Sequence, residues 1–320
     1  MSDSYDVVVV GAGVAGLSAA LFAGRYGLKT AVFDHFGLGG QVLNAGVLDS
    51  YPGLPDAVTG AAFVGRLSDQ ALDLGVEPEL SRVTAVVPDG AGFRVQTEGR
   101  GLLARSVIMA TGGTPVRLGL AGEETLEGRG VSHCAVCDGA FFSGQDVMVV
   151  GGGEAAAESA VYLSSMCRKV TLVHRREQFR ASALLQTQMR SKSNIEILTG
   201  AQVDQLNGDD SLQGAVLRTA EGAIIERELN GLFVCIGLTP DTELLRGVAD
   251  LDEHGRALVG LDMQTSRPGL FAAGSIRAGS PDQAITAAAD GATAALSAFH
   301  MLSNKSTHVS GLAGSRIGSR

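Results

Sequence analysis

A glycine pattern that occurs twice, 140 positions apart, restricts the fold of this sequence more than any other feature. The first copy consists of Gly11, Gly13 and Gly16, and it lies between an apolar run and a stretch of small residues. In this context G-x-G-x-x-G is typical of a strand, a tight turn and a helix whose N-terminus faces the phosphates of a dinucleotide. Asp34 follows Gly11 by 23 residues, where a carboxylate can hold ribose hydroxyls. The pattern therefore predicts a dinucleotide-binding unit.

The second copy has the form G-x-G-x-x-A, with Gly151, Gly153 and Ala156, and Glu154 opens the helix predicted after it. The next predicted strand ends at His174, again 23 residues after the first glycine. Because both landmarks recur at the same offset (11 to 151 and 34 to 174), we interpret them as an internal duplication of one nucleotide-binding unit. The alternative for either turn is a packing turn that holds no ligand. The repeated spacing favours two bound nucleotides.

The two copies differ where the second strand of each unit ends. In the second copy the place of Asp34 is taken by His174, Arg175 and Arg176, with Arg180 one helical turn further. A carboxylate repels a 2′-phosphate, whereas guanidinium groups bind it through paired, charge-assisted hydrogen bonds. The alternative is an ordinary solvated run of charged residues. It is less favoured because these residues stand at the position equivalent to Asp34 in the first copy. We therefore predict NADP(H) in the second unit and a non-phosphorylated adenosine, such as that of FAD, in the first.

A pair of cysteines, Cys134 and Cys137, indicates redox chemistry between the two glycine turns. Such a pair can close a disulfide or release two thiols, and a helix N-terminus favours the reactive thiolate. Asp138 follows directly and is placed to exchange protons with one sulfur. The alternative is half of a zinc site, which needs two further Cys or His ligands. Because Cys167 and Cys235 lie among apolar and small residues, we predict a redox pair and no metal.

Composition narrows the class of protein further. A chain of 320 residues suggests two domains, and 44 glycines with 45% hydrophobic and 18% charged residues suit an α/β protein with buried parallel strands. The net charge of −9 argues against a general nucleic-acid or anionic-membrane surface. The sequence shows no basic segment followed by an apolar run at its start, and no apolar stretch of about 18 residues. We predict a cytoplasmic location, where a closely spaced cysteine pair is catalytic rather than structural.

In combination, these motifs resemble the low-molecular-weight bacterial thioredoxin reductases from about Tyr5 to Leu302. The resemblance also includes residues 39–41, 110–112 and 283–284. It implies an α/β protein of two Rossmann-like, three-layer nucleotide-binding domains, in which an NADPH domain is inserted into a discontinuous FAD domain. The expected boundaries are 1–116 and 243–302 for the FAD domain, 117–242 for the NADPH domain with the cysteines, and 303–320 for a disordered tail without apolar periodicity.

The resemblance also implies which residues hold the cofactors. The FAD set is Gly11, Gly13, Gly16, Asp34, Gly40, Gln41, Ser50, Ala110, Thr111, Gly112, Gly274, Ser275, Gln283 and Ala284. The NADPH set is Gly151, Gly153, Glu154, Ala156, His174, Arg175, Arg176 and Arg180. Two positions depart from the family pattern, because Ser275 replaces a carboxylate that bonds the ribityl chain and Ser50 replaces an asparagine. Both are short hydroxyls, so we expect an altered flavin environment, with direct or water-bridged contacts.

The implied function is an NADPH-dependent flavoprotein disulfide reductase. Electrons are expected to pass from NADPH to FAD, then to the Cys134–Cys137 disulfide, and finally to thioredoxin or a thioredoxin-like protein. In the family's pattern Cys137 meets the flavin, Cys134 attacks the protein substrate, Asp138 handles the proton, and the chain forms a homodimer. Two alternatives remain open. A dithiol oxidase that uses FAD and oxygen does not need the arginines, and a redox-sensing flavoprotein without turnover suits Ser50 and Ser275.

Overall fold

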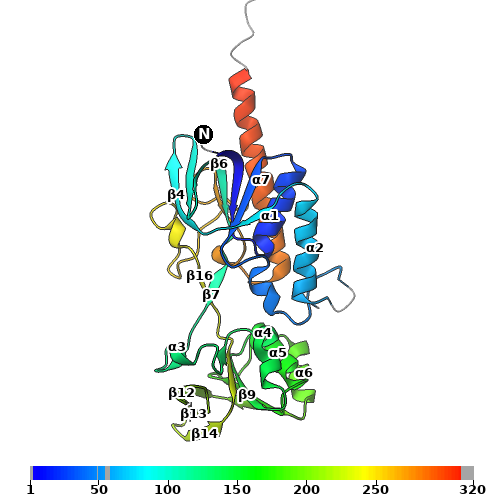
Figure 1. The fold of residues 1–320 in the computed structure, drawn as a ribbon, viewed down its shortest axis with the longest axis vertical. Helices are drawn as coiled ribbons and strands as arrows, with labels where there is room; N and C mark the ends of the chain where they lie inside the picture. The colour runs from blue at the N-terminus through cyan, green and yellow to red at the C-terminus, as the bar shows by residue number, and fades with distance from the viewer. Residues whose placement is uncertain (1–2, 49, 55–57, 311–320) are drawn as a thin grey trace, which may run out of the picture. The chain divides into compact units, whose positions relative to one another are not determined.

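The structure is a computed structural model that describes residues 3–48, 50–54 and 58–310. The chain divides into two compact units, and Figure 1 labels many of their helices and strands. Unit 1 comprises Met1–Val42, Asp49–Gly113 and Pro240–Arg320, and unit 2 comprises Leu43–Leu48 and Thr114–Thr239. Unit 2 thus interrupts unit 1 along the chain. Where the chain leaves and re-enters unit 1, the short strands β7 (Gly113–Pro115) and β16 (Leu238–Pro240) pair with each other.

Unit 1 alternates strands with helices in its first part and ends in a long helix. Its strands are β1 (Asp3–Val10), β2 (Thr30–Asp34), β3 (Pro78–Leu80), β4 (Val83–Asp89), β5 (Gly92–Thr97), β6 (Gly101–Met109) and β17 (Leu270–Ala272). Its helices are α1 (Val14–Arg25), α2 (Gly60–Leu72) and α7 (Ala284–Ser310), with 3-10 turns η3 (Glu243–Leu245) and η4 (Gly274–Ile276). A further 3-10 turn, η1 (Gly40–Asn44), begins in unit 1 and ends beyond its boundary at Val42.

The sheet of unit 1 runs in the order β3-β2-β1-β6-β5-β4. Strand β6 forks the sheet, because its first half pairs antiparallel with β5 and its second half pairs parallel with β17. Val8 and Val10 of β1 pack into a core cluster with the β4–β5 hairpin. Strand alternation directs Val7 and Val9, which are also fully buried, to the opposite face. A strand buried on both faces explains the uninterrupted valine run.

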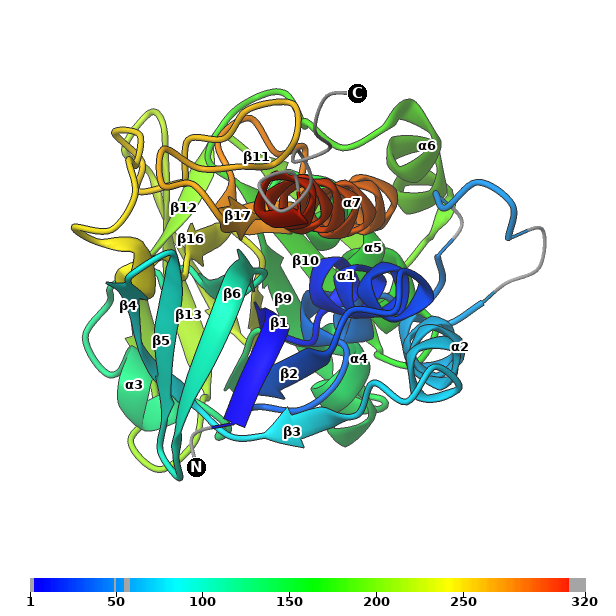
Figure 2. The ribbon, with the colours of Figure 1, turned by 90° about the horizontal axis from the view of Figure 1, so that it is seen from above.

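Helices α1 and α7 lie side by side over one face of this sheet (Figure 2). Their close approach depends on Gly291 of α7, where a Cβ atom would lie 2.0 Å from the carbonyl oxygen of Ala15. The missing side chain at Gly291 therefore lets α7 pack against the first turn of α1. This packing sets the position of the turn between β1 and α1, which carries the first glycine motif.

Unit 2 begins with short elements and continues as a second alternating fold. Its strands are β8 (Val131–Ser132), β9 (Asp146–Val150), β10 (Lys169–His174), β11 (Ile195–Thr199), β12 (Ala201–Asn207), β13 (Gly214–Thr219), β14 (Ile224–Glu228) and β15 (Gly231–Val234). Its helices are α3 (Glu123–Leu126), α4 (Ala135–Asp138), α5 (Glu154–Ser164) and α6 (Ala183–Ser191), with the 3-10 turn η2 (Gly139–Phe142).

Three layers make up unit 2. The central parallel sheet has the order β11-β10-β9-β15-β8, and a separate antiparallel sheet has the order β12-β13-β14. Met148 and Val150 of β9 face the antiparallel sheet, in one core cluster. The alternate residues Val147 and Val149 face α5 and α6, in another. Each face of the central sheet is therefore covered, as the apolar strands require.

The strand registers confirm the duplication. In unit 1, β1 pairs with β2 from Val7↔Thr30 to Val10↔Phe33. In unit 2, β9 pairs with β10 from Val147↔Val170 to Val150↔Val173, which is the same register 140 residues later (7 to 147 and 30 to 170). The predicted α/β class with two Rossmann-like nucleotide-binding folds is thus confirmed.

The end of the chain differs from the prediction. The sequence predicts a disordered tail from residue 303, but α7 continues to Ser310. Extending an existing helix adds a backbone hydrogen bond for each residue that becomes ordered, so it does not require apolar periodicity. Residues 311–320 lie outside the described residues. No helix in the described ranges has the combination of length and apolarity that a membrane crossing requires.

Candidate active site

The two cysteines form a disulfide on a short turn at the carboxyl end of β8. Cys134 and Cys137 are joined by an S–S bond, with their Cα atoms 5.3 Å apart. Cys134 is the N-cap of α4, and its sulfur accepts the backbone N–H of Cys137 at 3.0 Å. Cys137 is exposed and Cys134 is half-buried. The pair is accessible, and the helix end offers an N–H to the sulfur that carries charge when the bond opens.

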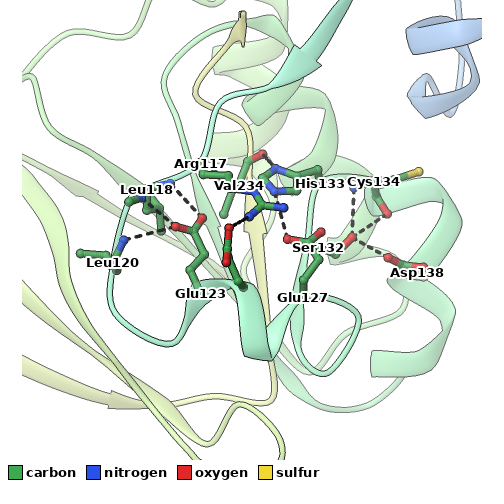
Figure 3. Close-up of polar contacts among 12 residues, drawn as sticks. Arg117, Leu118, Leu120, Glu123, Glu127, Ser132, His133, Cys134, Asp138 and Val234 are labelled. Atoms are coloured by element: carbon green, nitrogen blue, oxygen red, sulfur yellow. Dashed lines mark hydrogen bonds and ion pairs between the residues drawn. The ribbon is translucent and has the colours of Figure 1, made fainter.

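Asp138 is fixed beside this turn by Ser132 (Figure 3). The Ser132 hydroxyl donates to Oδ2 of Asp138 at 2.6 Å and accepts the backbone N–H of Cys134 at 3.0 Å. One buried hydroxyl therefore holds the carboxyl group and the backbone of the first cysteine together. Sequence reasoning identified Asp138 but missed Ser132. A hydroxyl residue two positions before the cysteine pair is the signal that could have indicated it.

The other two cysteines have unreactive surroundings. Burial raises the pKa of Cys167 to about 11, and the negative charge of Asp146 acts in the same direction. Burial also raises the pKa of Cys235, although a hydrogen bond with Ser159 at 3.5 Å acts in the opposite direction. Because only the thiolate reacts readily, neither side chain competes with the Cys134–Cys137 pair.

The glycine turn of unit 2 stands at the same edge of the central sheet as the cysteine turn. It joins β9 to α5, while the cysteine turn follows β8, and only β15 separates those two strands. Gly151 has a φ of +153°, and a Cβ there would lie 2.2 Å from the carbonyl oxygen of Cys235. At Gly153, in contrast, no protein atom lies within 4 Å of such a Cβ. The protein itself therefore requires the first glycine, and the second leaves the open space that a pyrophosphate needs.

Three guanidinium groups gather beyond the end of β10. Arg175, Arg176 and Arg180 are exposed, and within the described part of the chain none of their side chains has a hydrogen-bond or ion-pair partner. The backbone N–H of Arg180 donates to the carbonyl oxygen of Gly152 at 2.7 Å, which ties the arginine loop to the glycine turn. Exposed arginines without protein partners, tied to a glycine turn, are groups that can bind a phosphate dianion.

His174 is placed differently from the arginines that follow it. Its side chain is buried, stacks on Phe179 with 5.3 Å between ring centroids, and occupies the space where Gly152 has no side chain. Burial lowers the pKa of His174, a hydrogen bond to the carbonyl of Gln178 raises it, and the charges of the three arginines lower it. The ring therefore packs against the glycine turn at Gly152, and the lowered pKa favours its neutral form.

The remaining predicted residues of the second site lie within the turn and helix α5. Glu154 begins α5, and its Oε1 accepts the backbone N–H of Ser182 at 2.7 Å, which links the starts of α5 and α6. Ala156 is buried against Gly151, where an added Cβ would lie 2.7 Å from the Cβ of Ala156. The structure thus gives both residues packing or bridging contacts that position the turn.

The glycine turn of unit 1 repeats this arrangement. At Gly11, with a φ of +103°, a Cβ would lie 2.2 Å from the carbonyl oxygen of Ala110, and at Gly16 it would lie 1.8 Å from that of Gly11. At Gly13 the nearest protein atom would be 3.8 Å away, the carbonyl oxygen of Gly39. The outer two glycines therefore allow strand and helix to pack, and the middle one leaves room for phosphate groups.

Asp34 has a role that its position in the sequence did not reveal. Its Oδ2 accepts the N–H of Ala12 at 2.7 Å, and its Oδ1 accepts the N–H groups of Phe36 and Gly37 at 2.8 and 3.1 Å. A carboxylate offers about four acceptor positions, so about one remains for a ribose hydroxyl. Asp34 thus holds the glycine turn and the loop after β2 in place, and it retains capacity for a ligand.

Most of the other predicted FAD residues lie near the carboxyl ends of the parallel strands of unit 1. Gln41 donates to the carbonyl of Gly113 at 3.1 Å, and the Thr111 hydroxyl donates to that of Asp241 at 2.5 Å. Gly40 and Gln41 belong to η1, and Ala110, Thr111 and Gly112 follow β6. Gly274 and Ser275 follow β17, and Gln283 and Ala284 lie at the start of α7. Ser50 lies in an exposed turn. The structure therefore groups most of this set at one edge of one sheet.

An ion pair that sequence reasoning missed supports the turn that contains Ser275. Arg277 donates through Nε and Nη2 to the two oxygens of Asp290 at 2.6 and 3.1 Å. Oδ2 of Asp290 also accepts the N–H of Gly274 at 3.2 Å. Asp290 is buried in α7, so this pairing fixes η4 against the helix. Arg277 and Asp290 are 13 residues apart in the sequence, so no local sequence pattern indicated this ion pair.

A cavity of about 350 Å³ lies in unit 2 next to the cysteine turn. Ser132 and Asp138 line one part of it, and Arg129, Phe141 and Phe142 line another. Phe141 is 77% exposed. An exposed aromatic and a cation therefore stand beside the carboxyl group that adjoins the disulfide.

Comparison with known proteins gives one consistent result. A profile of the pyridine nucleotide-disulphide oxidoreductases matches residues 5–291. The thioredoxin reductase of Helicobacter pylori is 39% identical over 93% of this chain and 98% of that protein. The bifunctional thioredoxin reductase/thioredoxin of Mycobacterium leprae is 40% identical over 93% of this chain and 66% of that protein.

A solved structure of Lactococcus lactis thioredoxin reductase (FR conformation) matches with a TM-score of 0.91 at 34% identity, covering 94% of this chain and 99% of that one. These matches confirm the resemblance seen in the motifs. The chain belongs to the pyridine nucleotide-disulphide oxidoreductase family, among its thioredoxin reductases.

Proposed function

We propose that this protein is an NADPH-dependent flavoprotein disulfide reductase that acts on thioredoxin or a thioredoxin-like protein. The observation that carries the proposal is the arrangement of unit 2. An accessible disulfide and a glycine turn with three unpaired arginines stand at one edge of the same parallel sheet. A nucleotide site and a redox-active pair on one sheet edge are what such a reductase needs.

NADPH is assigned to unit 2 by the arginine cluster. A 2′-phosphate carries the negative charge that Arg175, Arg176 and Arg180 bind through charge-assisted hydrogen bonds. Gly151 and Gly153 form the pyrophosphate turn, and His174 and Ala156 pack against it. Glu154 positions the start of α5 through Ser182.

FAD is assigned to unit 1, where the strand that matches β10 ends in Asp34 rather than in arginines. Gly13 leaves room for the pyrophosphate, and the remaining acceptor position of Asp34 suits a ribose hydroxyl. By the family pattern, Ser275 and Ser50 occupy the positions whose side chains contact the flavin half of FAD, and each offers a short hydroxyl group there. When bound, NADPH would supply a hydride and FAD would supply the means of passing its electron pair to the Cys134–Cys137 disulfide.

The protein residues then carry out a dithiol–disulfide exchange. The Cys134 thiolate attacks one sulfur of the substrate disulfide, and the substrate sulfur that leaves takes up a proton. The Cys137 thiolate next attacks the Cys134 sulfur, which releases the second substrate thiol and restores the Cys134–Cys137 disulfide. Asp138, held by Ser132 at 2.6 Å, supplies or accepts the proton at these sulfurs.

A thioredoxin-type partner suits the surface beside the disulfide. Phe141 offers an exposed aromatic ring, and Arg129 offers a positive charge at the cavity that adjoins Asp138. Exposed aromatic and arginine side chains are the residues that dominate protein interfaces. The Mycobacterium leprae relative, whose name joins thioredoxin reductase to thioredoxin, also supports this partner. A homodimeric state and a cytoplasmic location stay predictions from the sequence.

A dithiol oxidase on the same scaffold is not favoured, because the relatives are named thioredoxin reductases and the arginines have no use in it. The test is a steady-state assay under air with purified protein, NADPH and a thioredoxin disulfide. NADPH oxidation that depends on thioredoxin and produces its dithiol is expected. Oxygen consumption driven by a small dithiol, without any effect of NADPH, would contradict the proposal.

A further inference from the structure

Strand β8 ends one residue too early to complete its pairing with β15. The two strands are parallel, and their last paired residues are Ser132 and Phe233. In a parallel ladder continued in this register, the Val234 carbonyl would accept the N–H of Cys134. That N–H donates instead to the Ser132 hydroxyl at 3.0 Å, because the chain turns into α4. The redox turn therefore begins where a backbone hydrogen bond between the strands is missing.

The imidazole of His133 takes the place of the missing donor (Figure 3). Its Nδ1 lies 3.2 Å from the carbonyl oxygen of Val234. Because a carbonyl oxygen only accepts, Nδ1 carries a proton in this contact. The side chain is only 13% exposed, so the bond is shielded from water. His133 thus extends the pairing of β8 with β15 to the residue directly before Cys134.

The opposite side of the ring faces a carboxylate. Nε2 of His133 lies 3.4 Å from Oε2 of Glu127, at the end of α3. The backbone of Glu127 also forms an isolated β-bridge with Val131. The backbone N–H of the next residue, Gly128, donates to the carbonyl oxygen of Val131 at 2.9 Å. Glu127 is therefore fixed to the strand that carries His133. When Nε2 also carries a proton, as in the imidazolium form, Glu127 accepts from it and holds the ring in the orientation that reaches Val234.

We propose that His133, held by Glu127, is a positioning residue for the redox pair. It ties the peptide before Cys134 to the end of β15 and keeps the two cysteines at the separation that a disulfide requires. When the disulfide opens, the covalent restraint is lost and the imidazole contact remains. A dithiol that stays in place loses less conformational entropy on closing, so the contact favours the disulfide. The inference rests on the proposed function, because it treats this pair as one that opens and closes.

The test measures the disulfide–dithiol equilibrium of Cys134–Cys137 in the full-length protein, using thiol redox buffers and peptide mass mapping after alkylation. We expect His133→Ala to shift the equilibrium toward the dithiol about tenfold, which is about 30 mV for a two-electron couple. His133→Asn places an amide N–H near the Nδ1 position and should restore the wild-type value. His133→Gln places its amide near Nε2 and should not.

The matched control is His254→Ala. His254 also faces a carboxylate, that of Glu253 at 3.7 Å, but it is exposed and belongs to unit 1, so no shift is expected. The proposal is overturned if the Ala, Asn and Gln variants of His133 share the wild-type equilibrium, or if Asn behaves as Ala does. If the Ala variant does not fold, the comparison of Asn with Gln decides. The readout requires neither nicotinamide nor protein substrate, so its failure is distinct from a failure of the proposed function.

Discussion

Ser132 donates a 2.6 Å hydrogen bond to the carboxyl group of Asp138, across the turn that carries the disulfide. The same hydroxyl accepts the N–H of Cys134, so one atom connects the proposed proton carrier to the attacking cysteine. Because Ser132 is buried, water does not readily replace these contacts.

Substitution of Ser132 should therefore slow thiol–disulfide exchange with the protein substrate more than it slows reduction of the flavin by NADPH. We expect Ser132→Ala to destabilise the protein by about 1–3 kcal/mol, the cost of leaving a partly buried polar group without its partner. Reduction of a thioredoxin disulfide should slow, while NADPH reduces the flavin at an unchanged rate. Ser132→Thr keeps the hydroxyl and is the control, and rapid-mixing absorbance separates the two steps. Equal slowing of both steps would contradict this role.

Removal of the arginine cluster should change cofactor choice. For Arg175→Ala combined with Arg176→Ala we expect NADPH binding to weaken by about 2–5 kcal/mol, the range for losing hydrogen-bonded charge partners, with NADH binding nearly unchanged. Arg246→Ala, an exposed arginine paired with Glu243 in unit 1, is the control. Binding is measured by titration calorimetry. An unchanged preference for NADPH over NADH would show that the phosphate site lies elsewhere.

The buried imidazole of His174 should make the protein sensitive to acid. Its pKa in the folded state lies below the ordinary value of 6.5, so between the two values the unfolded chain binds more protons than the folded one. This contribution to stability is present above pH 6.5 and is lost as the pH falls from there toward the folded-state pKa. We expect His174→Gln to reduce the loss of unfolding free energy between about pH 7.5 and 5.5, measured by urea titration. If the unfolding free energies of the wild type and of His174→Gln depend on pH in the same way, His174 is not the source of the acid sensitivity.

The two kinds of glycine in the first turn should respond differently to an added methyl group. Gly16→Ala places a Cβ 1.8 Å from a backbone oxygen, so it should lower the melting temperature of the protein without cofactor. Gly13→Ala meets no protein atom closer than 3.8 Å, so it should keep that stability and lose bound FAD. Flavin content and apoprotein melting are measured together. Full retention of FAD in Gly13→Ala would mean that no phosphate lies there.

Much of the fold was predictable because its signals are local. The spacing from Gly11 to Asp34, repeated from Gly151 to His174, places a strand, a turn, a helix and a second strand in each unit. Local patterns did not reveal β8, which has only two residues and forms because the distant strand β15 offers it an edge. The position of Ser132 two residues before the cysteine pair was a local signal, whereas the contact of His133 with Val234 depends on that edge, so no local pattern indicated it. The same holds for the ion pair that fixes η4, which forms only because α7 packs beside that turn.

The direction of electron flow is the central claim, and anaerobic half-reactions of the cysteine variants test it most directly. In Cys134→Ser and Cys137→Ser, NADPH should still bleach the visible absorbance of the bound flavin, whereas reduction of a thioredoxin disulfide should be abolished. The two half-reactions would then separate at the Cys134–Cys137 disulfide, as the account predicts. If NADPH leaves the flavin oxidised in the wild-type protein while a small dithiol reduces it, electrons run from thiols to flavin and the account is contradicted.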